Sequence, residues 1–504
     1  MSSPHNEAIY HRGDVIGGRF EVQGILGKGV FGIVYLVYDR ELRGAYAMKT
    51  FSGEFAGAEK ARGMFEREAA LWSGLAEHPF VLAARFAGEI NGRPFLTTDY
   101  IAPDIVGRVK LSQHIAQRTI DADRALTWTI QFCHGMEHTR AHGIECHRDI
   151  KPANVFITED GMVKIADFGL ALAAEDAGEF SPENEEEEMR TGRRVTGSAG
   201  YAAPEVFEKG RASVRSDIYS FGVVLWQMVT AQQPFGLEPG DDLDAYVDEL
   251  EKRQLAGDVP PVDAPFWPQI KCCLDPDLEK RYSDFGELRG ELENLIRERT
   301  GEVPGVPDSD CFAISSLSNK ASGLMRIGRH GEAIECHDKV LEMAPACVSA
   351  WFKKGVALSE MGKAEDAFAC YDKTLALDPS HSEAWNSKGV LLMRLNRFPE
   401  ALECLDKSIE ADPSRAWVWS NKGNLLSRLE RYEEALVCYD KALEVDANYI
   451  AVWFNMGLAQ ERLGRGKDAA QSYRKLIGLC APEHRMLADR ARQRLNSLAF
   501  MGIY

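Results

Sequence analysis

A glycine-rich segment near the N-terminus has the residue types needed to wrap around phosphate groups. It reads GILGKGVFGIVYLV, in which Gly27, Gly29 and Gly32 are followed two residues later by Val34. Glycines let backbone amides approach phosphate oxygens closely, but this spacing alone is a weak signal. β-Branched and aromatic residues flank the glycines on both sides, which predicts a hairpin. The segment therefore favours a lid over nucleotide phosphates, and not a dinucleotide-binding fold.

A lysine follows in the apolar segment YAMKTF, which predicts a strand that carries Lys49 inward. There its ammonium would meet the charge of nucleotide α- and β-phosphates, whereas the simpler interpretation is a lysine on a surface strand. The next segment, FEREAALWSGLAEHPF, is expected to be a helix. Glu68 has the better spacing to pair with Lys49, and Glu66 is the alternative, because the helix register is not settled by sequence.

Three further motifs carry charged residues, and they read HRDIKPANVF, KIADFGLA and GYAAPEVF. With the glycine-rich segment they resemble, in order and separation, the signature set of eukaryotic-type (Hanks-type) serine/threonine protein kinases. The resemblance runs from about residue 18 to residue 298. It implies the α+β bilobal protein kinase fold for this part of the chain.

The resemblance also implies roles for single residues, with ATP and Mg²⁺ as the cofactors. Asp149 accepts or orients the substrate hydroxyl, and Lys151 neutralises the γ-phosphate; its place in DIKPAN favours serine and threonine substrates. Asn154 and Asp167 hold Mg²⁺, because a hard cation takes oxygen ligands. Lys49, held by the helix glutamate, anchors ATP.

Other positions in the resemblance concern the adenine pocket and the support of the catalytic loop. FLTTDYIA is similar to the hinge segment, with Thr98 at the gate to the pocket behind adenine and Asp99 to Ile101 at the adenine-binding backbone. Asp217 is similar to the buried aspartate that organises the catalytic loop. Glu205 and Arg281 are similar to the ion pair that braces the helical lobe.

The elements that position these residues are expected to end near residue 300. The segment RTGEVPGVPDSD is rich in proline, glycine and aspartate and predicts a linker. The expected organisation is an N-terminal extension (1–17), a kinase domain (18–298), a linker (299–313), five helical repeats (314–483) and a C-terminal capping helix and tail (484–504).

The second half of the chain repeats with a period of 34 residues. The recurring positions are Trp351, Trp385, Trp419 and Trp453; Gly355, Gly389, Gly423 and Gly457; and Ala333, Ala367, Ala401, Ala435 and Ala469. This pattern resembles the tetratricopeptide repeat, a helix-turn-helix unit, and implies an all-α solenoid with a concave groove for a peptide or protein ligand. The first unit lacks the tryptophan and has Ala321 at the glycine position.

Two further ladders follow the same period. Cys336, Cys370, Cys404 and Cys438 are expected to be buried packing residues, because equivalent repeat positions lie roughly 10 Å apart, too far for Zn–S bonds of about 2.3 Å. The arginine ladder consists of Arg326, Arg394, Arg428 and Arg462, and Glu360 interrupts it. It is either a soluble surface or a basic stripe for an acidic peptide.

Bulk composition excludes several classes of protein. The formal net charge of −18 argues against nucleic acid or anionic membrane as the main partner. No apolar run reaches the roughly 20 residues needed to span a bilayer. The N-terminal sequence has no apolar core of a signal peptide, so a cytoplasmic location with reduced thiols is expected.

The segment between the DFG and APE motifs, FSPENEEEEMRTGRRVTGS, is expected to belong to the activation segment. The run from Glu185 to Glu188 is either a solvated spacer or a charged switch. As a switch it occupies the basic pocket around Arg148, or pairs with Arg190, Arg193 and Arg194, until phosphate at Thr191 or Thr196 displaces it. Two classes of function remain open at this point. The first is an active kinase whose repeats recruit substrates or regulators, and the second is an adaptor in which the kinase fold is an ATP-gated switch. The repeats are also candidates for making a homodimer.

Overall fold

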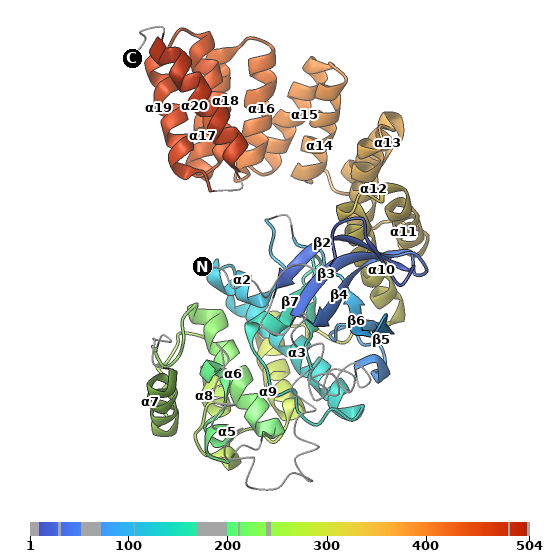
Figure 1. Cartoon of the computed structure of the whole chain (residues 1–504), viewed down its shortest axis with the longest axis vertical. Coiled ribbons are helices and arrows are strands. Elements are labelled where there is room, and N and C mark those ends of the chain that lie inside the picture. The colour runs from blue at the N-terminus through green and yellow to red at the C-terminus, as the bar shows by residue number, and fades with distance from the viewer. Residues whose placement is uncertain are drawn as a thin grey trace. The chain divides into compact units, whose positions relative to one another are not determined.

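The computed structural model describes residues 10–28, 32–51, 72–104, 106–168, 199–209, 212–237, 243–481 and 484–500. These residues fall into two compact units, Met1–Arg329 and His330–Tyr504 (Figure 1). Predicted positions Gly29, Glu66, Glu68, Arg190, Thr191, Arg193, Arg194 and Thr196, and the run from Glu185 to Glu188, lie outside the described residues.

The first unit begins with an antiparallel sheet in the order β1-β2-β3-β4-β6-β5, here called the sheet lobe. Its strands are β1 (Val15–Ile16), β2 (Phe20–Lys28), β3 (Gly32–Asp39), β4 (Gly44–Phe51), β5 (Ala84–Ile90) and β6 (Arg93–Asp99). Alternate apolar residues such as Val22, Tyr35 and Met48 point to one buried face, as the two-residue period of a strand requires. Strands β2 and β3 pair with Gly27 opposite Val34, which confirms the predicted hairpin.

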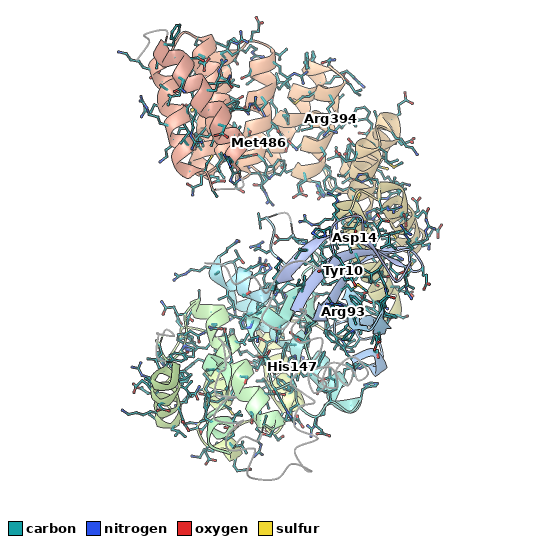
Figure 2. All side chains as sticks on the ribbon, viewed as in Figure 1. Tyr10, Asp14, Arg93, His147, Arg394 and Met486 are labelled. Carbon is teal, nitrogen blue, oxygen red and sulfur yellow. The ribbon has the colours of Figure 1, made fainter. Side chains whose placement is uncertain are left out.

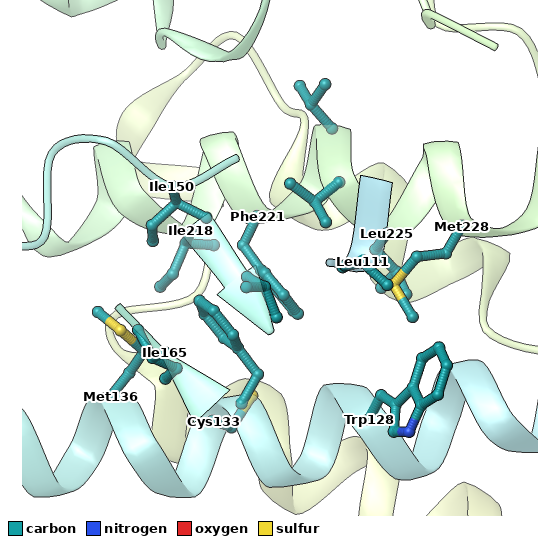
Figure 3. Close-up of a cluster of buried hydrophobic side chains, with 14 of the residues drawn as sticks. Leu111, Trp128, Cys133, Met136, Ile150, Ile165, Ile218, Phe221, Leu225 and Met228 are labelled. Atoms are coloured by element: carbon teal, nitrogen blue, oxygen red, sulfur yellow. The ribbon is translucent and has the colours of Figure 1, made fainter. Parts of the chain in front are cut away.

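The helical lobe follows in the same unit. It contains α2 (Leu111–Ala116), α3 (Ala122–Ala141), α5 (Pro204–Lys209), α6 (Val214–Thr230), α7 (Leu243–Ala256), α8 (Trp267–Cys273) and α9 (Phe285–Thr300), with the short hairpin β7 (Val155–Ile157) and β8 (Val163–Ile165). Helix α6 is buried along almost its whole length, and most of its residues from Ile218 to Met228 are apolar. Trp128, Cys133 and Met136 on α3 face Phe221 and Leu225 of α6 in the core of this lobe (Figure 3).

One more helix belongs to the first unit. Helix α9 ends at Thr300 with Gly301 in a left-handed conformation (φ 81°), and α10 (Ser309–Arg326) begins nine residues later with Asp308 as its N-cap. Helix α10 packs against β4 of the sheet lobe. The expected linker and repeat boundaries stay predictions, but α10 includes the start of the first predicted repeat.

The second unit consists of antiparallel helix pairs. They are α11 (His330–Met343), α12 (Val348–Glu360), α13 (Ala364–Leu377), α14 (Ser382–Arg394), α15 (Phe398–Ala411), α16 (Ala416–Arg428), α17 (Tyr432–Val445), α18 (Ile450–Arg462), α19 (Gly466–Leu479) and α20 (Arg485–Phe500). A Cβ atom on Gly423 would lie 2.6 Å from Cε1 of Tyr439, and one on Gly457 would lie 2.5 Å from Cε1 of Tyr473. The repeated glycine is therefore required because the two helices of one tetratricopeptide-like repeat approach each other closely.

The two periodic ladders have structural roles in the second unit. The four repeat cysteines are buried free thiols, which confirms the packing interpretation. Arg394 makes an ion pair with Glu360 of the preceding repeat at 3.3 Å, and the guanidinium of Arg428 lies 5.2 Å from the ring centre of Phe398. Both arginines thus contact a neighbouring repeat, and the basic stripe stays a prediction. Figure 2 labels Arg394 on α14 and Met486 on α20.

Candidate active site

The loop between α3 and β7 carries the HRD motif, and Asp217 holds its backbone in place. Asp217 lies in the first turn of α6 and is 1% exposed. Its two carboxylate oxygens accept hydrogen bonds from the backbone N–H groups of His147 (2.6 Å) and Arg148 (2.8 Å). Burial raises the pKa of Asp217, and these bonds to the charged form partly oppose that rise. The bonds fix the loop at Arg148, whose φ of 67° is left-handed.

Three polar side chains converge at the next residues of the loop. Lys151 Nζ lies 2.9 Å and 2.6 Å from the two carboxylate oxygens of Asp149. Asn154 Nδ2 donates to the Asp149 carboxylate and to the Asp149 backbone carbonyl, both at 2.9 Å. The sequence-predicted group of Asp149, Lys151 and Asn154 is therefore brought together, with the carboxylate held in one orientation. His147, two residues before Asp149, is labelled in Figure 2, and its Nε2 donates to Ala166 O at 3.2 Å.

The predicted metal and nucleotide residues of the two lobes also meet. Lys49 on β4 places Nζ 3.2 Å from Asp167 Oδ1. Desolvation by itself raises the pKa of Asp167, but the ammonium of Lys49 outweighs it and the net shift is downward. Asp167 has a left-handed φ of 68°, and the next residue, Phe168, is 1% exposed. The buried phenyl ring anchors a strained backbone that points the carboxylate toward Lys49.

Trp72 is a supporting residue that sequence analysis did not single out. Its ring meets the Phe168 ring edge-on with the centres 5.5 Å apart, and its Nε1 donates to Leu82 O at 2.6 Å. The Phe168 ring also lies 4.8 Å from the ring of His147. A tryptophan in a segment expected to be a helix was the only sequence signal for this contact, because the partner is distant along the chain.

The hinge connects the lobes after β6. Thr98 pairs with Ala47 of β4 and is 9% exposed, so it is largely buried near the C-terminal end of β6. Arg85 Nε and Nη2 donate to the two carboxylate oxygens of Asp99, at 2.6 Å and 2.8 Å. These two bonds hold the Asp99 side chain against Arg85, with 24% of that side chain exposed. Ile101 is buried at the start of the helical lobe.

A buried ion pair supports the helical lobe below this site. Arg281 Nη1 and Nη2 lie 2.8 Å and 2.9 Å from the two carboxylate oxygens of Glu205, and the Arg281 side chain has no exposure. Ser216 Oγ donates a further bond to Glu205 at 2.7 Å. Burial alone would raise the pKa of Glu205, but these donors make the net shift downward. The two-fold contact is the geometry at which an arginine pairs most strongly with a carboxylate.

The donor set fits a hard divalent cation that also binds a ligand. Asn154 makes its described bonds through Nδ2, so its Oδ1 is the atom suited to a cation, and Asp167 adds carboxylate oxygens. Among the described residues, no group of three or more histidine, cysteine, aspartate or glutamate side chains is placed to hold a metal. Asn154 Oδ1 and the Asp167 carboxylate suit Mg²⁺, which proteins commonly bind together with substrate phosphates.

Comparison with known proteins agrees with this geometry. The protein kinase domain family matches residues 20–292, and tetratricopeptide repeat families match residues 353–416 and 416–449. A probable serine/threonine-protein kinase of Streptomyces coelicolor is 32% identical over 285 residues, which cover 56% of this chain and 40% of that protein. Serine/threonine-protein kinase PknB of Mycolicibacterium smegmatis is 31% identical over 294 residues, covering 57% of this chain and 44% of PknB.

The likeness is therefore partial in length. The chain spans less than half the length of these curated relatives. The solved kinase domain of Mycobacterium tuberculosis PknI is 21% identical, with a TM-score of 0.41, and the match covers 57% of this chain and 100% of that domain. In the part of the chain that the structure describes, no helix is long and apolar enough to cross a membrane. From the family match over more than half of its residues, the chain belongs to the protein kinase domain family, with tetratricopeptide repeats after the kinase domain.

Proposed function

We propose that this chain is a serine/threonine protein kinase that transfers the γ-phosphoryl group of ATP to hydroxyl groups of protein substrates. The observation that carries the proposal is the orientation of the Asp149 carboxylate by Lys151 and Asn154 in a loop braced by Asp217. A positioned carboxylate and a neighbouring ammonium are what phosphoryl transfer requires, since this reaction depends on positioning and on neutralising charge.

The transfer step uses Asp149 and Lys151 in different ways. Asp149 accepts a hydrogen bond from the substrate hydroxyl and directs its oxygen at the γ-phosphorus. The new bond joins that oxygen to phosphorus, the bond from phosphorus to the β–γ bridging oxygen breaks, and the hydroxyl proton passes to Asp149 and then to solvent. Lys151, 2.6 Å from Asp149, is close enough to stabilise negative charge on the phosphoryl group as it moves.

Lys49 and Asp167 are proposed to hold the nucleotide. Lys49 Nζ is placed to donate to the α- and β-phosphate oxygens, and Asp167 keeps it in position. Asn154 and Asp167 would hold Mg²⁺, which neutralises phosphate charge when bound. Gly27 and Gly32, with Gly29 beyond the described residues, are proposed to cover the phosphates, while Val34 packs against the nucleotide and Glu68 supports Lys49.

The hinge is proposed to bind adenine through its backbone at Asp99 and Ile101. Because Arg85 occupies the Asp99 carboxylate, the side chain does not compete for this role. Thr98 is small, and it is the residue proposed to set the width of the pocket behind adenine.

The partners of the protein are part of the same proposal. Protein substrates and a peptide or protein in the repeat groove are the expected partners, and the acidic net charge of −18 disfavours nucleic acid. The eleven free cysteines are consistent with a reducing cytoplasm. Homodimer formation through the repeats is a further expectation, for which a concentration-dependent mass in solution is the test.

Transfer of radiolabelled γ-phosphate to a generic basic protein tests the proposal. The wild-type chain is expected to label the substrate on serine or threonine, and Asp149→Asn, which keeps the size of the side chain, is expected to abolish labelling. Asp123→Asn is the matched control, since Asp123 is an exposed aspartate on α3, away from the loop. Labelling by wild type that Asp149→Asn retains would overturn the assigned role. No transfer by the wild-type chain under any activating condition would favour the adaptor alternative.

A further inference from the structure

Helix α10 contacts the hinge through the backbone of Tyr100. Asn319 Nδ2 donates to the backbone carbonyl of Tyr100 at 2.9 Å. Tyr100 lies between Asp99 and Ile101, so this bond holds the middle residue of the hinge. Close to it, a Cβ atom on Gly323 would lie 3.1 Å from Cβ of Ala45 and 3.3 Å from Cδ1 of Tyr100. The absence of a side chain at Gly323 is what allows α10 to approach this closely.

The C-terminal end of α10 is attached to the sheet lobe. Lys320 Nζ donates to Leu42 O at 2.7 Å, in the turn between β3 and β4. Ile327, just after the helix, packs on a cluster formed by Leu36, Ala45, Tyr100 and Ala102. The guanidinium of Arg329 lies 4.2 Å from the ring centre of Tyr38 and 3.5 Å from Glu21. Several contacts of different kinds therefore join this end of the segment to one lobe.

The other contacts of α10 reach the helical lobe. Ser315 Oγ donates to Asp160 at 2.6 Å and Ser322 Oγ donates to Glu159 at 3.2 Å, both in the turn between β7 and β8. Lys164 of β8 lies with Nζ 5.3 Å from the ring centre of Phe312. Burial lowers the pKa of Lys164 to about 8. A cavity of about 60 Å³ remains between α10 and the hinge.

We propose that α10 is a splint across the hinge, which limits the opening of the two lobes and so sets the affinity of the cleft for nucleotide. One helix holds the sheet lobe, the hinge carbonyl and the helical lobe at once, so the lobes cannot separate without breaking some of these contacts. A structural role alone would stabilise the fold without changing nucleotide affinity. The proposal rests on the nucleotide site described under Proposed function.

The test uses Asn319→Asp in the full chain. This substitution keeps the size of the side chain, removes the donor to Tyr100 O and places a carboxylate against that carbonyl. Loss of this partly buried hydrogen bond is expected to weaken binding of a non-hydrolysable ATP analogue with Mg²⁺ by about threefold or more. The Michaelis constant for ATP should rise by the same factor while kcat changes less. Amide exchange at residues 99–102 should become faster.

The matched control is Asn294→Asp on α9. Asn294 is exposed, and its Oδ1 accepts a bond from Arg297, so an aspartate there adds the same charge and keeps the acceptor. A second variant, Gly323→Val, forces α10 away from Ala45 and Tyr100 by bulk, and it should change analogue affinity and exchange in the same direction. Thermal unfolding of all the variants reports whether the fold is retained.

Each outcome is decisive for one proposal or the other. The splint is refuted if Asn319→Asp and Gly323→Val both speed amide exchange within α10 while the analogue affinity and the amide exchange of the hinge stay at wild-type values. If affinity falls in Asn294→Asp as much as in Asn319→Asp, the effect is one of charge, and the splint is also refuted. If the wild-type chain binds the analogue but transfers no phosphate, the proposed function fails, whereas the affinity comparison still judges the splint. The splint is supported if Asn319→Asp and Gly323→Val bind the analogue more weakly than wild type and Asn294→Asp does not.

Discussion

Lys49 and Asp167 are in contact, with Nζ 3.2 Å from Oδ1, although 118 residues separate them along the chain. Lys49 comes from the sheet lobe and Asp167 from the start of the segment after β8. Both side chains keep partial exposure, 35% and 44%, so the pair is accessible to a ligand. The contact holds two groups that are proposed to meet the same nucleotide from different lobes.

Replacing Lys49 is expected to separate catalysis from stability. Lys49→Met should reduce phosphate transfer by about 100-fold or more, because a group that neutralises phosphate charge is lost. The free energy of unfolding should change by less than about 1 kcal/mol, since a partly exposed ion pair contributes little. Transfer rates and thermal unfolding measured side by side check this. Lys49→Arg serves as the control for charge, and a loss of activity that follows a loss of folded protein would count against the assignment.

The Glu205–Arg281 pair is expected to have the opposite profile. Glu205→Ala leaves the buried guanidinium of Arg281 without its partner, so unfolding free energy should fall by about 3–5 kcal/mol. Replacing both residues by methionine should cost less than the single change. Denaturant unfolding provides the measurement. The exposed pair of Arg299 and Asp123 is the control, and Arg299→Ala should cost no more than about 1 kcal/mol. Equal effects at the two pairs would contradict the argument from burial.

Two glycines in helices should respond to alanine with opposite signs. Gly423→Ala places Cβ 2.6 Å from Cε1 of Tyr439, so it should destabilise the repeat unit by about 1–3 kcal/mol. Gly290→Ala on α9 meets nothing within 4 Å, and its lower backbone entropy cost should raise stability by about 0.5–1 kcal/mol. The melting temperatures of the two variants check the prediction. A stabilising effect of Gly423→Ala would show that the repeats do not need this close approach.

Acidification is expected to destabilise the first unit through His78. Burial, with a contribution from neighbouring histidines and Lys164, lowers the pKa of His78 from 6.5 to about 3. Between these pH values His78 is protonated in the unfolded chain and neutral in the folded chain. The contribution of His78 to the free energy of unfolding is therefore complete at pH 7 and is lost as the pH falls below 6.5. After a discount for partial exposure, His78 should account for about 1 kcal/mol at pH 5.

His78→Asn tests this sign. Asparagine keeps an acceptor near Nδ1, which receives the Phe80 N–H at 3.3 Å, but it does not titrate. The variant should show a flatter fall in melting temperature between pH 7 and pH 5. Some slope should remain, because burial also lowers the pKa of His337 in the second unit, to about 4. An unchanged slope would mean that His78 is accessible to protons in the folded state.

The role of the acidic run from Glu185 to Glu188 stays a prediction. It can be tested by removing the four charges. Replacing all four glutamates with glutamine should change basal transfer activity or its dependence on phosphate at Thr191 and Thr196, if the run occupies the pocket of Arg148. Phosphate mapping of the wild type beside Asp149→Asn identifies which threonine the protein modifies itself. Unchanged activity, with no phosphate at either threonine, would leave the run as a spacer.

Much of the chemistry was readable from local sequence. Asp149, Lys151 and Asn154 lie within six residues, so their types and spacing are enough to identify the loop. The repeat was also readable, because a glycine or an alanine recurs at each close helix contact with a 34-residue period. The catalytic loop and the repeats could be predicted because they depend on residue spacing and on neighbours along the chain, which a sequence displays directly.

Local sequence did not reveal which face of α10 would be covered, or by what. The helix reads as the first repeat helix, with Ala321 in the place of the repeated glycine, and yet Asn319 and Gly323 lie against a hinge more than 200 residues earlier in the chain. Trp72 on Phe168 is a contact of the same kind. The sequence by itself determined the elements and the reactive residues. The tertiary structure decided these partners, because distant surfaces pair through shape and burial that no local pattern records.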